Sequence, residues 1–165
     1  MKQLVLIRHG KAARDVPVDS DHERPLLQKG VERTLLVAAY LKEQGVKPQL
    51  ILSSHAVRAH DTAKLIAGKL LDTPPAVRVE ESIYYRGRDA LYDIITSLHD
   101  DLSTVIMVGH NPHMTHFVNM FIDSPIGYLP TSAAVGFSFT TGRWADVLLA
   151  ERKTLFYMTP RLLRG

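Results

Sequence analysis

Short apolar runs alternate with segments of helical periodicity along this chain, and this alternation limits the possible folds more than any other feature. Strands are predicted where the runs stand, at residues 4–7, 50–52, 77–79 and 105–108. Short apolar runs between turn signals are typical of buried strands, and strands that alternate with helices usually pair in parallel. The sequence therefore predicts an α/β fold with a mostly parallel sheet.

The segments between these runs carry apolar residues at helical spacing. Gly45 marks the end of the first predicted helix, and Ser53 and Ser54 are expected to cap the second. Pro112 is expected to be the first residue of the fourth. The predicted helices span residues 27–41, 59–70, 89–98 and 113–121, two further strands span residues 133–140 and 154–158, and a long polar loop spans residues 12–25.

Length and composition are those of an ordinary globular protein. The chain has 165 residues, 45% of them hydrophobic, so we expect a single domain over residues 1–165 with a sizeable core. No small-residue cleavage site follows the N-terminal apolar stretch, and no apolar run approaches the length of a membrane span. A cytoplasmic protein without membrane contact is therefore expected. The absence of cysteine excludes disulfides and thiolate metal sites.

The charge balance is mildly basic. Lysine and arginine outnumber the acidic residues by 20 to 17, and the isoelectric point is about 9.2. This excess favours anionic substrates or acidic partners. The basic residues form no consecutive block and are not interleaved with aromatic residues, so a nucleic-acid partner is not expected.

Arginine and histidine residues follow three of the predicted strands. Arg8 and His9 come directly after the first strand, Arg58 lies in the first turn of the helix after the second, and His110 follows the run at residues 105–108. In open α/β sheets, ligands bind outside the carboxyl ends of the strands. We therefore expect these side chains to face one pocket, although they are far apart in the sequence.

These residue types suit an oxyanion, and a phosphate above all. A guanidinium is a permanent cation whose fork matches phosphate oxygens, and a neutral imidazole can take a proton or attack as a nucleophile. Helix N-termini predicted near Ser54 and Asn111 would add backbone N–H groups and the positive end of the helix dipole. Together these features predict a site for a phosphate dianion.

Three motifs resemble those of the histidine phosphatase superfamily: Arg8-His9-Gly10, residues 58–63 (RAHDTA) and residues 108–112 (VGHNP). Within its branch 1, which is phosphoglycerate mutase-like, the chain is similar to the short phosphohistidine phosphatases of the SixA type. That similarity rests on Arg24-Pro25-Leu26 and Gly30 after the first motif, and on Thr131-Ser132-Ala133 after the last. It extends over nearly the whole chain and implies a three-layer α/β/α sandwich around the mostly parallel sheet.

The resemblance also implies a role for each site residue. His9 would be the nucleophile and would form a phosphohistidine intermediate. Arg8 and Arg58 would bind the phosphoryl oxygens, His110 would donate to the same oxygens as an imidazolium, and the backbone N–H of Asn111 is a further candidate ligand. Phosphoryl transfer mainly requires positioning and charge stabilisation, so neither a metal ion nor a cofactor is expected.

The chain departs from the wider superfamily pattern at the proton donor. Lys11 stands where many members carry an acid, and residues 82–87 (SIYYRG) hold no glutamate. An alkoxide leaving group needs a proton donor, whereas the imidazole of phosphohistidine leaves more easily once solvent protonates it. The missing acid therefore favours an N–P bond in the substrate. Glu81 is the first candidate among the acids that could still donate a proton. The other candidates are Glu80, Asp15 and Glu23.

Other histidines near these motifs are interpreted as ordinary residues. His110, His113 and His116 are spaced by three residues, which turns them progressively off one helix face. No acid completes the set, so a metal site is not predicted. His55 and His60 could touch a substrate but stay outside the predicted catalytic set.

Several further residues have two possible roles. Thr131 and Ser132 either offer hydroxyls to the phosphate or satisfy backbone groups at the start of the next strand, and the structural role is favoured. Arg86 and Arg88 either extend a basic rim towards an acidic partner or are simply solvated, whereas Lys11 is expected to guide anions. The aromatic residues predicted to pack in the core or at its edge are Trp144, Tyr84 and Tyr85.

The sequence thus predicts a phosphatase that works through a phosphohistidine intermediate on His9. Its expected substrate is a phosphorylated protein such as a histidine phosphotransfer domain, with phosphate ion as product. Two alternatives stay open. One is a phosphomonoesterase of small sugar or nucleotide phosphates, and the other is a phosphate- or phosphoprotein-binding module with weak catalysis, against which the intact His9 argues.

Overall fold

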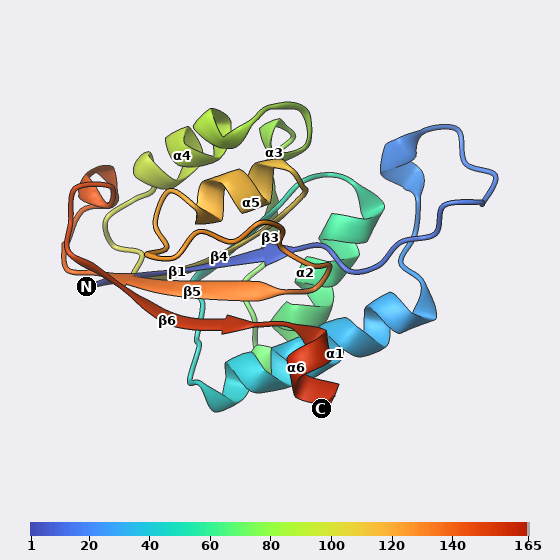
Figure 1. Cartoon of the computed structure of the whole chain (residues 1–165), viewed down its shortest axis with the longest axis horizontal. Helices are drawn as coiled ribbons and strands as arrows, with labels where there is room; N and C mark the ends of the chain where they lie inside the picture. The colour runs from blue at the N-terminus through green and yellow to red at the C-terminus, as the bar shows by residue number, and fades with distance from the viewer. Residues whose placement is uncertain (165) are drawn as a thin grey trace.

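Six strands form one sheet in the computed structural model, which describes residues 1–164 (Figure 1). They are β1 (Lys2–Arg8), β2 (Leu50–Ser53), β3 (Val77–Val79), β4 (Thr104–Gly109), β5 (Ala134–Phe139) and β6 (Arg152–Met158). Their order across the sheet is β3-β2-β4-β1-β5-β6. The first four pair in parallel, and β5 pairs antiparallel with both β1 and β6. The prediction of a mostly parallel sheet is confirmed.

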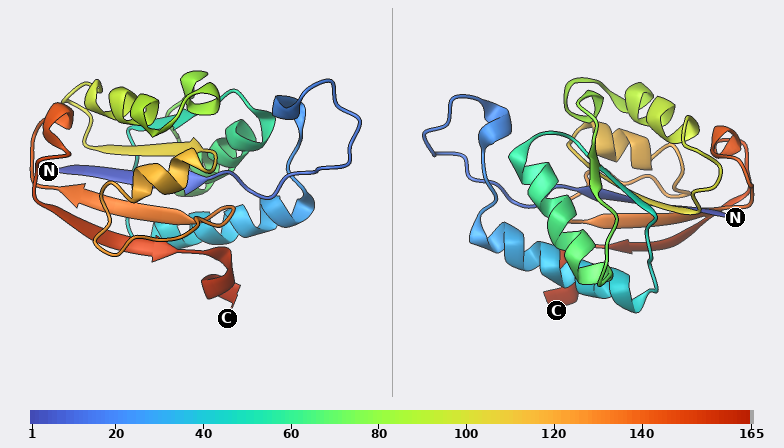
Figure 2. Two further views of the ribbon diagram at one scale, coloured as in Figure 1. Left: turned by 45° about the horizontal axis from the view of Figure 1, so that its top comes forward. Right: turned by 180° about the vertical axis from the view of Figure 1, so that it is seen from behind.

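Helices cover both faces of this sheet (Figure 2). Three pack on one face: α1 (Gln28–Glu43), α2 (Val57–Leu70) and α6 (Pro160–Arg164). Three others pack on the opposite face: α3 (Ser82–Tyr85), α4 (Arg88–Thr96) and α5 (His113–Val118). The predicted three-layer α/β/α sandwich is therefore confirmed. Two short 3-10 helices complete the described chain, η1 (Asp21–Glu23) and η2 (Trp144–Asp146), and no helix in it is long and apolar enough to cross a membrane.

The central strand β1 explains why the buried strands read as continuous apolar runs. Successive side chains of a strand point to opposite faces. Leu4 and Leu6 pack under α4 and α5, whereas Val5 and Ile7 pack against α1 and α2. All four are at most 2% exposed, and burial of each such side chain contributes about 1.5–3 kcal/mol. Because both faces are covered, the strand has no polar face to alternate with.

The helix ends differ from the predictions at the capping residues. Ala56, rather than Ser53 or Ser54, is the N-cap of α2, and the Ser54 hydroxyl accepts the Ala56 N–H at 3.3 Å from outside the helix. Pro112 is the N-cap of α5 rather than its first residue. That helix ends at Val118, earlier than predicted. Helices α3 and α6 were not predicted, because four and five residues are too few to show a period.

The loop between β1 and α1 projects from the body of the molecule (Figure 1). Its two ends are joined by an isolated bridge between Ala12 and Leu26. A Cβ atom on Gly30 would lie 2.3 Å from the carbonyl oxygen of Lys11, so the first turn of α1 can approach the loop this closely only with glycine there. The close approach holds the start of the loop beside the end of β1.

Candidate active site

A pocket of about 210 Å³ lies at the edge of the sheet where β1, β2 and β4 end. It is lined by Arg8, His9, Lys11, Ala12, Arg14, Arg24, Arg58, His110, Asn111 and Thr131. Half of these residues are arginine or lysine, two are histidine and none is acidic. The structure therefore brings together the five residues that the sequence predicted at three strand ends: Arg8, His9, Arg58, His110 and Asn111.

His9 is buried and has a defined tautomer. Its side chain is 8% exposed, and its Nδ1 lies 2.7 Å from the carbonyl oxygen of Gly10. A carbonyl only accepts hydrogen bonds, so Nδ1 carries the proton and Nε2 keeps its lone pair. Burial, together with the charges of Arg58, Arg8 and Arg24, lowers the pKa of His9 to about 4. The imidazole is neutral at neutral pH, as a nitrogen nucleophile must be.

The backbone of His9 is fixed from both sides. Its N–H donates to the carbonyl oxygen of Gly109 at 3.0 Å, and its own carbonyl oxygen accepts the Ser132 N–H at 3.1 Å. Ser132 is buried, has a positive φ of 62°, and shares a 2.8 Å hydrogen bond with the hydroxyl of Thr34. The Ser132 hydroxyl therefore pairs with another side chain and not with the backbone groups that were predicted, while its backbone N–H holds His9. Thr131, its neighbour, lines the pocket instead.

His110 lies beside His9, with 5.1 Å between the ring centroids. Burial, and then the proximity of His9 and Arg58, lowers the pKa of His110 to about 3. In the free protein it is therefore neutral, because the pocket is too dry and too basic to charge it. The imidazolium expected beside a bound phosphoryl group stays a prediction. Its Nε2 lies 2.6 Å from Ser54 Oγ. When that hydroxyl donates, the His110 proton sits on Nδ1.

Each of the two central arginines is held at its outer end. Arg58 donates from Nη1 to the backbone oxygen and from Nη2 to the carboxylate of Asp21, both at 2.9 Å. Arg8 donates from Nη1 to the hydroxyl of Tyr128 and, at 3.2 Å, to the carbonyl oxygen of Leu129. These contacts fix both guanidinium planes and leave their Nε atoms for other partners.

Several buried side-chain nitrogen atoms at this pocket have no hydrogen-bond partner. Among residues 1–164, the buried side-chain polar atoms that have no hydrogen-bond partner are Arg8 Nε, Arg58 Nε, His110 Nδ1 and His55 Nδ1. The first three belong to pocket residues that follow three different strands. An unsatisfied buried polar group costs about 1–3 kcal/mol. An oxyanion in the pocket would offer these donors an acceptor.

Asp21 is a site residue that sequence reasoning missed. Besides Arg58, its carboxylate accepts Arg24 Nε at 2.9 Å and the hydroxyl of Tyr84 at 2.5 Å. The Tyr84 hydrogen bond and the two arginines hold the pKa of Asp21 well below its usual range, and the same hydrogen bond raises the pKa of Tyr84. Asp21 is therefore ionised and can only accept. An acid in a polar loop gives no sequence signal for these contacts.

None of the four acids proposed as proton donors lines the pocket. Glu81 is exposed at the N-cap of α3, and Glu80 pairs with Arg78 at 3.2 Å. Glu23 accepts N–H groups of its own loop, and Asp15 lines a neighbouring, more apolar hollow. No carboxyl group thus faces the space beside His9.

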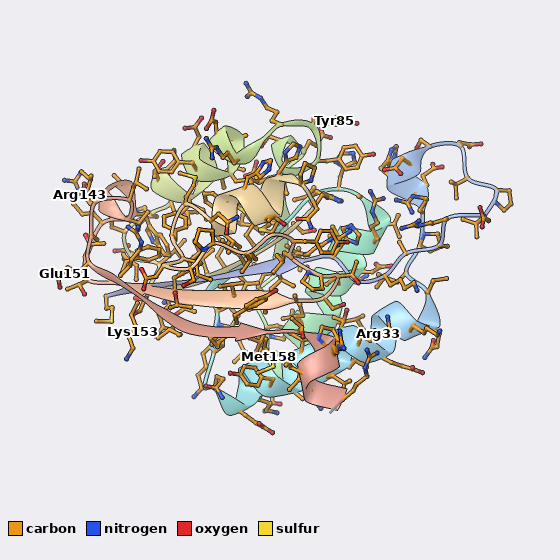
Figure 3. All side chains as sticks on the ribbon, in the orientation of Figure 1. Arg33, Tyr85, Arg143, Glu151, Lys153 and Met158 are labelled. Atoms are coloured by element: carbon orange, nitrogen blue, oxygen red, sulfur yellow. The ribbon has the colours of Figure 1, made fainter. Side chains whose placement is uncertain are left out.

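The aromatic residues that were predicted to pack in the core or at its edge differ in burial. Trp144 is fully buried, as predicted, and Tyr85 is 65% exposed (Figure 3). Tyr84 does more than pack, because its ring stands edge-on to His110 at 5.2 Å and its hydroxyl binds Asp21. His55 packs against Tyr84 and Tyr85, and His60 is half-buried outside the pocket.

A separate pocket lies beside the loop that carries Arg86 and Arg88. It is lined by His113, His116, Arg86 and Arg88 among others. No group of three or more histidine, aspartate or glutamate residues in the described part of the chain is placed to hold a metal ion.

Comparison with protein families identifies this arrangement. The sequence profile of the histidine phosphatase superfamily (branch 1) matches residues 4–83, the segment that holds Arg8, His9 and Arg58. Over this segment the chain is similar to the histidine phosphatase superfamily. An uncharacterized chloroplastic protein of Arabidopsis thaliana is 32% identical over 142 residues, which are 81% of this chain and 65% of that protein. The chain thus spans less than two thirds of the length of that relative.

SixA proteins match over nearly their whole length. Phosphohistidine phosphatase SixA of Escherichia coli strain K12 is 29% identical over 154 residues, covering 90% of this chain and 86% of SixA. The solved structure of the protein histidine phosphatase SixA with tungstate has a TM-score of 0.79 at 24% identity, and the match covers 98% of this chain and 99% of that one. The fold of this chain is therefore phosphoglycerate mutase-like, as in SixA.

Proposed function

We propose that this chain is a protein phosphohistidine phosphatase, which moves a phosphoryl group from a histidine of a partner protein to His9 and then to water. One observation carries the proposal. Three buried, unpartnered nitrogens of Arg8, Arg58 and His110 belong to the pocket that holds a neutral His9. Donors for an oxyanion and a nucleophile for phosphorus are thereby provided in one place.

In the first step, the lone pair on His9 Nε2 attacks the phosphorus atom. A new N–P bond forms as the bond to the substrate imidazole breaks, and the departing ring nitrogen takes a proton from solvent. The hydrogen bond from Nδ1 to Gly10 keeps the attacking nitrogen unprotonated. Arg8, Arg58, His110 and the backbone N–H of Asn111 stabilise the charge on the phosphoryl oxygens.

In the second step, a water molecule attacks the phosphorus atom of phosphorylated His9. The electron pair of the N–P bond returns to Nε2, and both protons of the water leave with the released phosphate, which gives one up to solvent as the pH requires. The net reaction converts phosphohistidine and water into histidine and phosphate. Phosphorylated His9 and the substrate both carry phosphorus on an imidazole nitrogen, so neither step expels an alkoxide.

The absence of a nearby acid supports an N–P rather than an O–P bond in the substrate. No carboxyl group lines the pocket, and the carboxylate nearest to Arg58, that of Asp21, is ionised because Tyr84 and the two arginines bind it. An ester would have to expel an alkoxide without a proton donor. Similarity to SixA over 90% of the chain supports the same choice, and a histidine phosphotransfer domain is the proposed partner.

Substrate competition tests this function. The purified protein is given a phosphohistidine-bearing phosphotransfer domain and a panel of sugar and nucleotide monoesters, in the presence of a metal chelator. We expect kcat/KM for the phosphoprotein to exceed that for every ester by about a hundredfold or more, which corresponds to about 2.7 kcal/mol in the transition state. A preference for any ester would overturn the N–P assignment, and loss of activity in chelator would overturn metal independence.

The intermediate is tested separately. Rapid quenching of the wild-type protein should trap an acid-labile, base-stable phosphoryl label, as expected for phosphohistidine, and the His9→Ala variant should trap none. Equal turnover by the two proteins would exclude His9 as nucleophile. Binding of phosphate without turnover in the wild type would instead favour the binding module.

A further inference from the structure

A second basic pocket lies at the same edge of the sheet as the first. Strand β6 is antiparallel to β5, which is antiparallel to β1, so β6 and β1 run in the same direction. The end of β6 at Met158 and the helix α6 that follows it therefore lie at the edge where β1 ends at Arg8. Helix α1 contacts α6 there, and Arg33 of α1 is drawn beside α6 (Figure 3).

Three arginines line this second pocket. Its volume is about 310 Å³, and it is lined by Arg33, Arg161 and Arg164, with Thr131 shared between it and the pocket of His9. The two pockets are therefore neighbours on one surface. No acidic residue lines either of them.

Residues 1–164 supply no ion pair that balances the charge of Arg33 or Arg161 in this second pocket. Between residues 1 and 164, no ion pair or side-chain hydrogen bond involves Arg33 or Arg161. A guanidinium stays charged, and its fork suits carboxylate and phosphate oxygens. By contrast, the pocket of Arg86 and Arg88 is also lined by acids, Asp89 and Asp93. Of the basic surfaces outside the active site, the one on α1 and α6 is thus the better suited to an anion.

We propose that Arg33, Arg161 and Arg164 form a second anion subsite, which binds a carboxylate or phosphate group of the substrate while the phosphoryl group occupies the pocket of His9. Thr131, which lines both pockets, would lie between the second anion and the phosphoryl group. In a phosphoprotein the second anion is an acidic side chain close to the phosphohistidine. The subsite deepens the function proposed above and rests on it for the identity of the substrate, but not for the binding of a ligand with two anionic groups.

Ligands with two anionic ends test the subsite without turnover. Methylphosphonate carries one anion, and alkane bisphosphonates of increasing chain length carry two. Calorimetric titration of the wild type should show one chain length that binds about tenfold more tightly than methylphosphonate, because the second end binds at high effective concentration. The Arg33→Gln/Arg161→Gln variant should lose this gain and keep the affinity for methylphosphonate.

Arg143→Gln is the control for the loss of an arginine charge far from the subsite. Arg143 is exposed, with 67% of its side chain accessible, and lies at the opposite end of the molecule from Arg33 (Figure 3). This variant should keep the full gain from the second anion. A flat length series in the wild type, or an equal loss in the Arg143 variant, would refute the subsite. Thermal unfolding of all three proteins shows whether each is folded.

Kinetics then identify where the second anion comes from. For a phosphohistidine protein, the Arg33→Gln/Arg161→Gln variant should raise KM about tenfold with kcat unchanged, and for phosphoramidate, which has no second anion, it should change neither constant. If KM rises only for small phosphorylated acids, the subsite is supported, and its natural ligand is a small molecule and not a phosphoprotein. A wild type that turns over no N–P substrate contradicts the proposed function, while the bisphosphonate result still decides the subsite.

Discussion

The two walls of the active-site pocket differ in how they are built. The inner wall, formed by His9, Arg58 and His110, comes from strand ends and the first turn of α2, and its side chains are only 5–8% exposed. The outer wall, formed by Lys11, Arg14 and Arg24, comes from the loop after β1, where the first two are exposed and Arg24 is half-buried. Buried groups act in a low dielectric and are held rigidly, whereas exposed charges are screened. The inner wall is therefore suited to chemistry and the outer wall to attracting the substrate.

The largest difference between the walls should be seen on removal of an arginine from each. Arg58→Ala should lower kcat/KM about a thousandfold, because a buried donor to the transferring phosphoryl group is lost and the Asp21 carboxylate loses one of its three partners. Arg14→Ala should lower kcat/KM less than about tenfold, as expected for an exposed charge. Steady-state kinetics on one phosphohistidine substrate measures both. Similar losses would show that the two walls do not differ in function.

Arg58→Lys sharpens that comparison. Lysine keeps the charge but not the planar fork that spans Asp21 and the pocket. We expect most of the loss of Arg58→Ala to remain in this variant. Full activity in Arg58→Lys would mean that charge alone matters at this position.

The second prediction concerns the buried histidines of the inner wall. The folded-state pKa of His9 is about 4, below the ordinary value of 6.5, so the unfolded chain binds this proton first as the pH falls. The free energy of unfolding should thus be highest above about pH 6.5 and should fall towards pH 4. His9 accounts for about 3 kcal/mol of that loss. Urea denaturation across this range measures it.

His9→Asn provides the control, since asparagine does not titrate. The variant should lose stability less steeply with falling pH than the wild type, and the remaining slope should report His110, whose pKa is lowered to about 3. A wild-type NMR titration should find His9 deprotonated at pH values where an exposed histidine is half protonated. Identical slopes in wild type and variant would contradict the assignment.

The inner wall could be predicted from the sequence, whereas most of its supports could not. His9 and His110 each follow a continuous apolar run, and Arg58 opens a helix with a clear buried face, so the α/β topology alone brings them to one edge. Ser54 and Asp21 contact these residues only because the loops fold back on the sheet. The sequence gives Ser54 an ordinary capping signal, and the cap proves to be Ala56.

The second anion subsite could not be predicted from the sequence either. Arg161 lies on a helix of five residues, too short to show a period. Arg33 is half-buried and is one of three basic residues of α1. Their proximity follows from the direction of β6, which two antiparallel pairings fix. Tertiary pairing of this kind has no local sequence signal.

The third prediction addresses Asp21, which joins the two walls by binding Arg58 and Arg24. Asp21→Asn removes a negative charge that opposes a phosphate dianion, so inorganic phosphate should inhibit about three- to tenfold more strongly. Asp15→Asn is the matched control, because Asp15 lies in the same loop and makes no ion pair among the described residues. Product-inhibition constants for the three proteins test this. If both variants bind phosphate alike, the Asp21 carboxylate does not set phosphate affinity.

The smallest effect is expected at the outer wall and should depend on salt. Lys11 is exposed at the pocket, so Lys11→Gln should lower kcat/KM about two- to fivefold at low ionic strength, through slower association with an anionic partner. At high salt the difference should vanish, because the Debye length falls to about 3 Å at 1 M. A buried residue such as Arg58 should show no such recovery. An effect of Lys11→Gln that persists at high salt would place Lys11 in direct contact with the phosphoryl group, and would move it from the outer wall to the chemistry of the inner one.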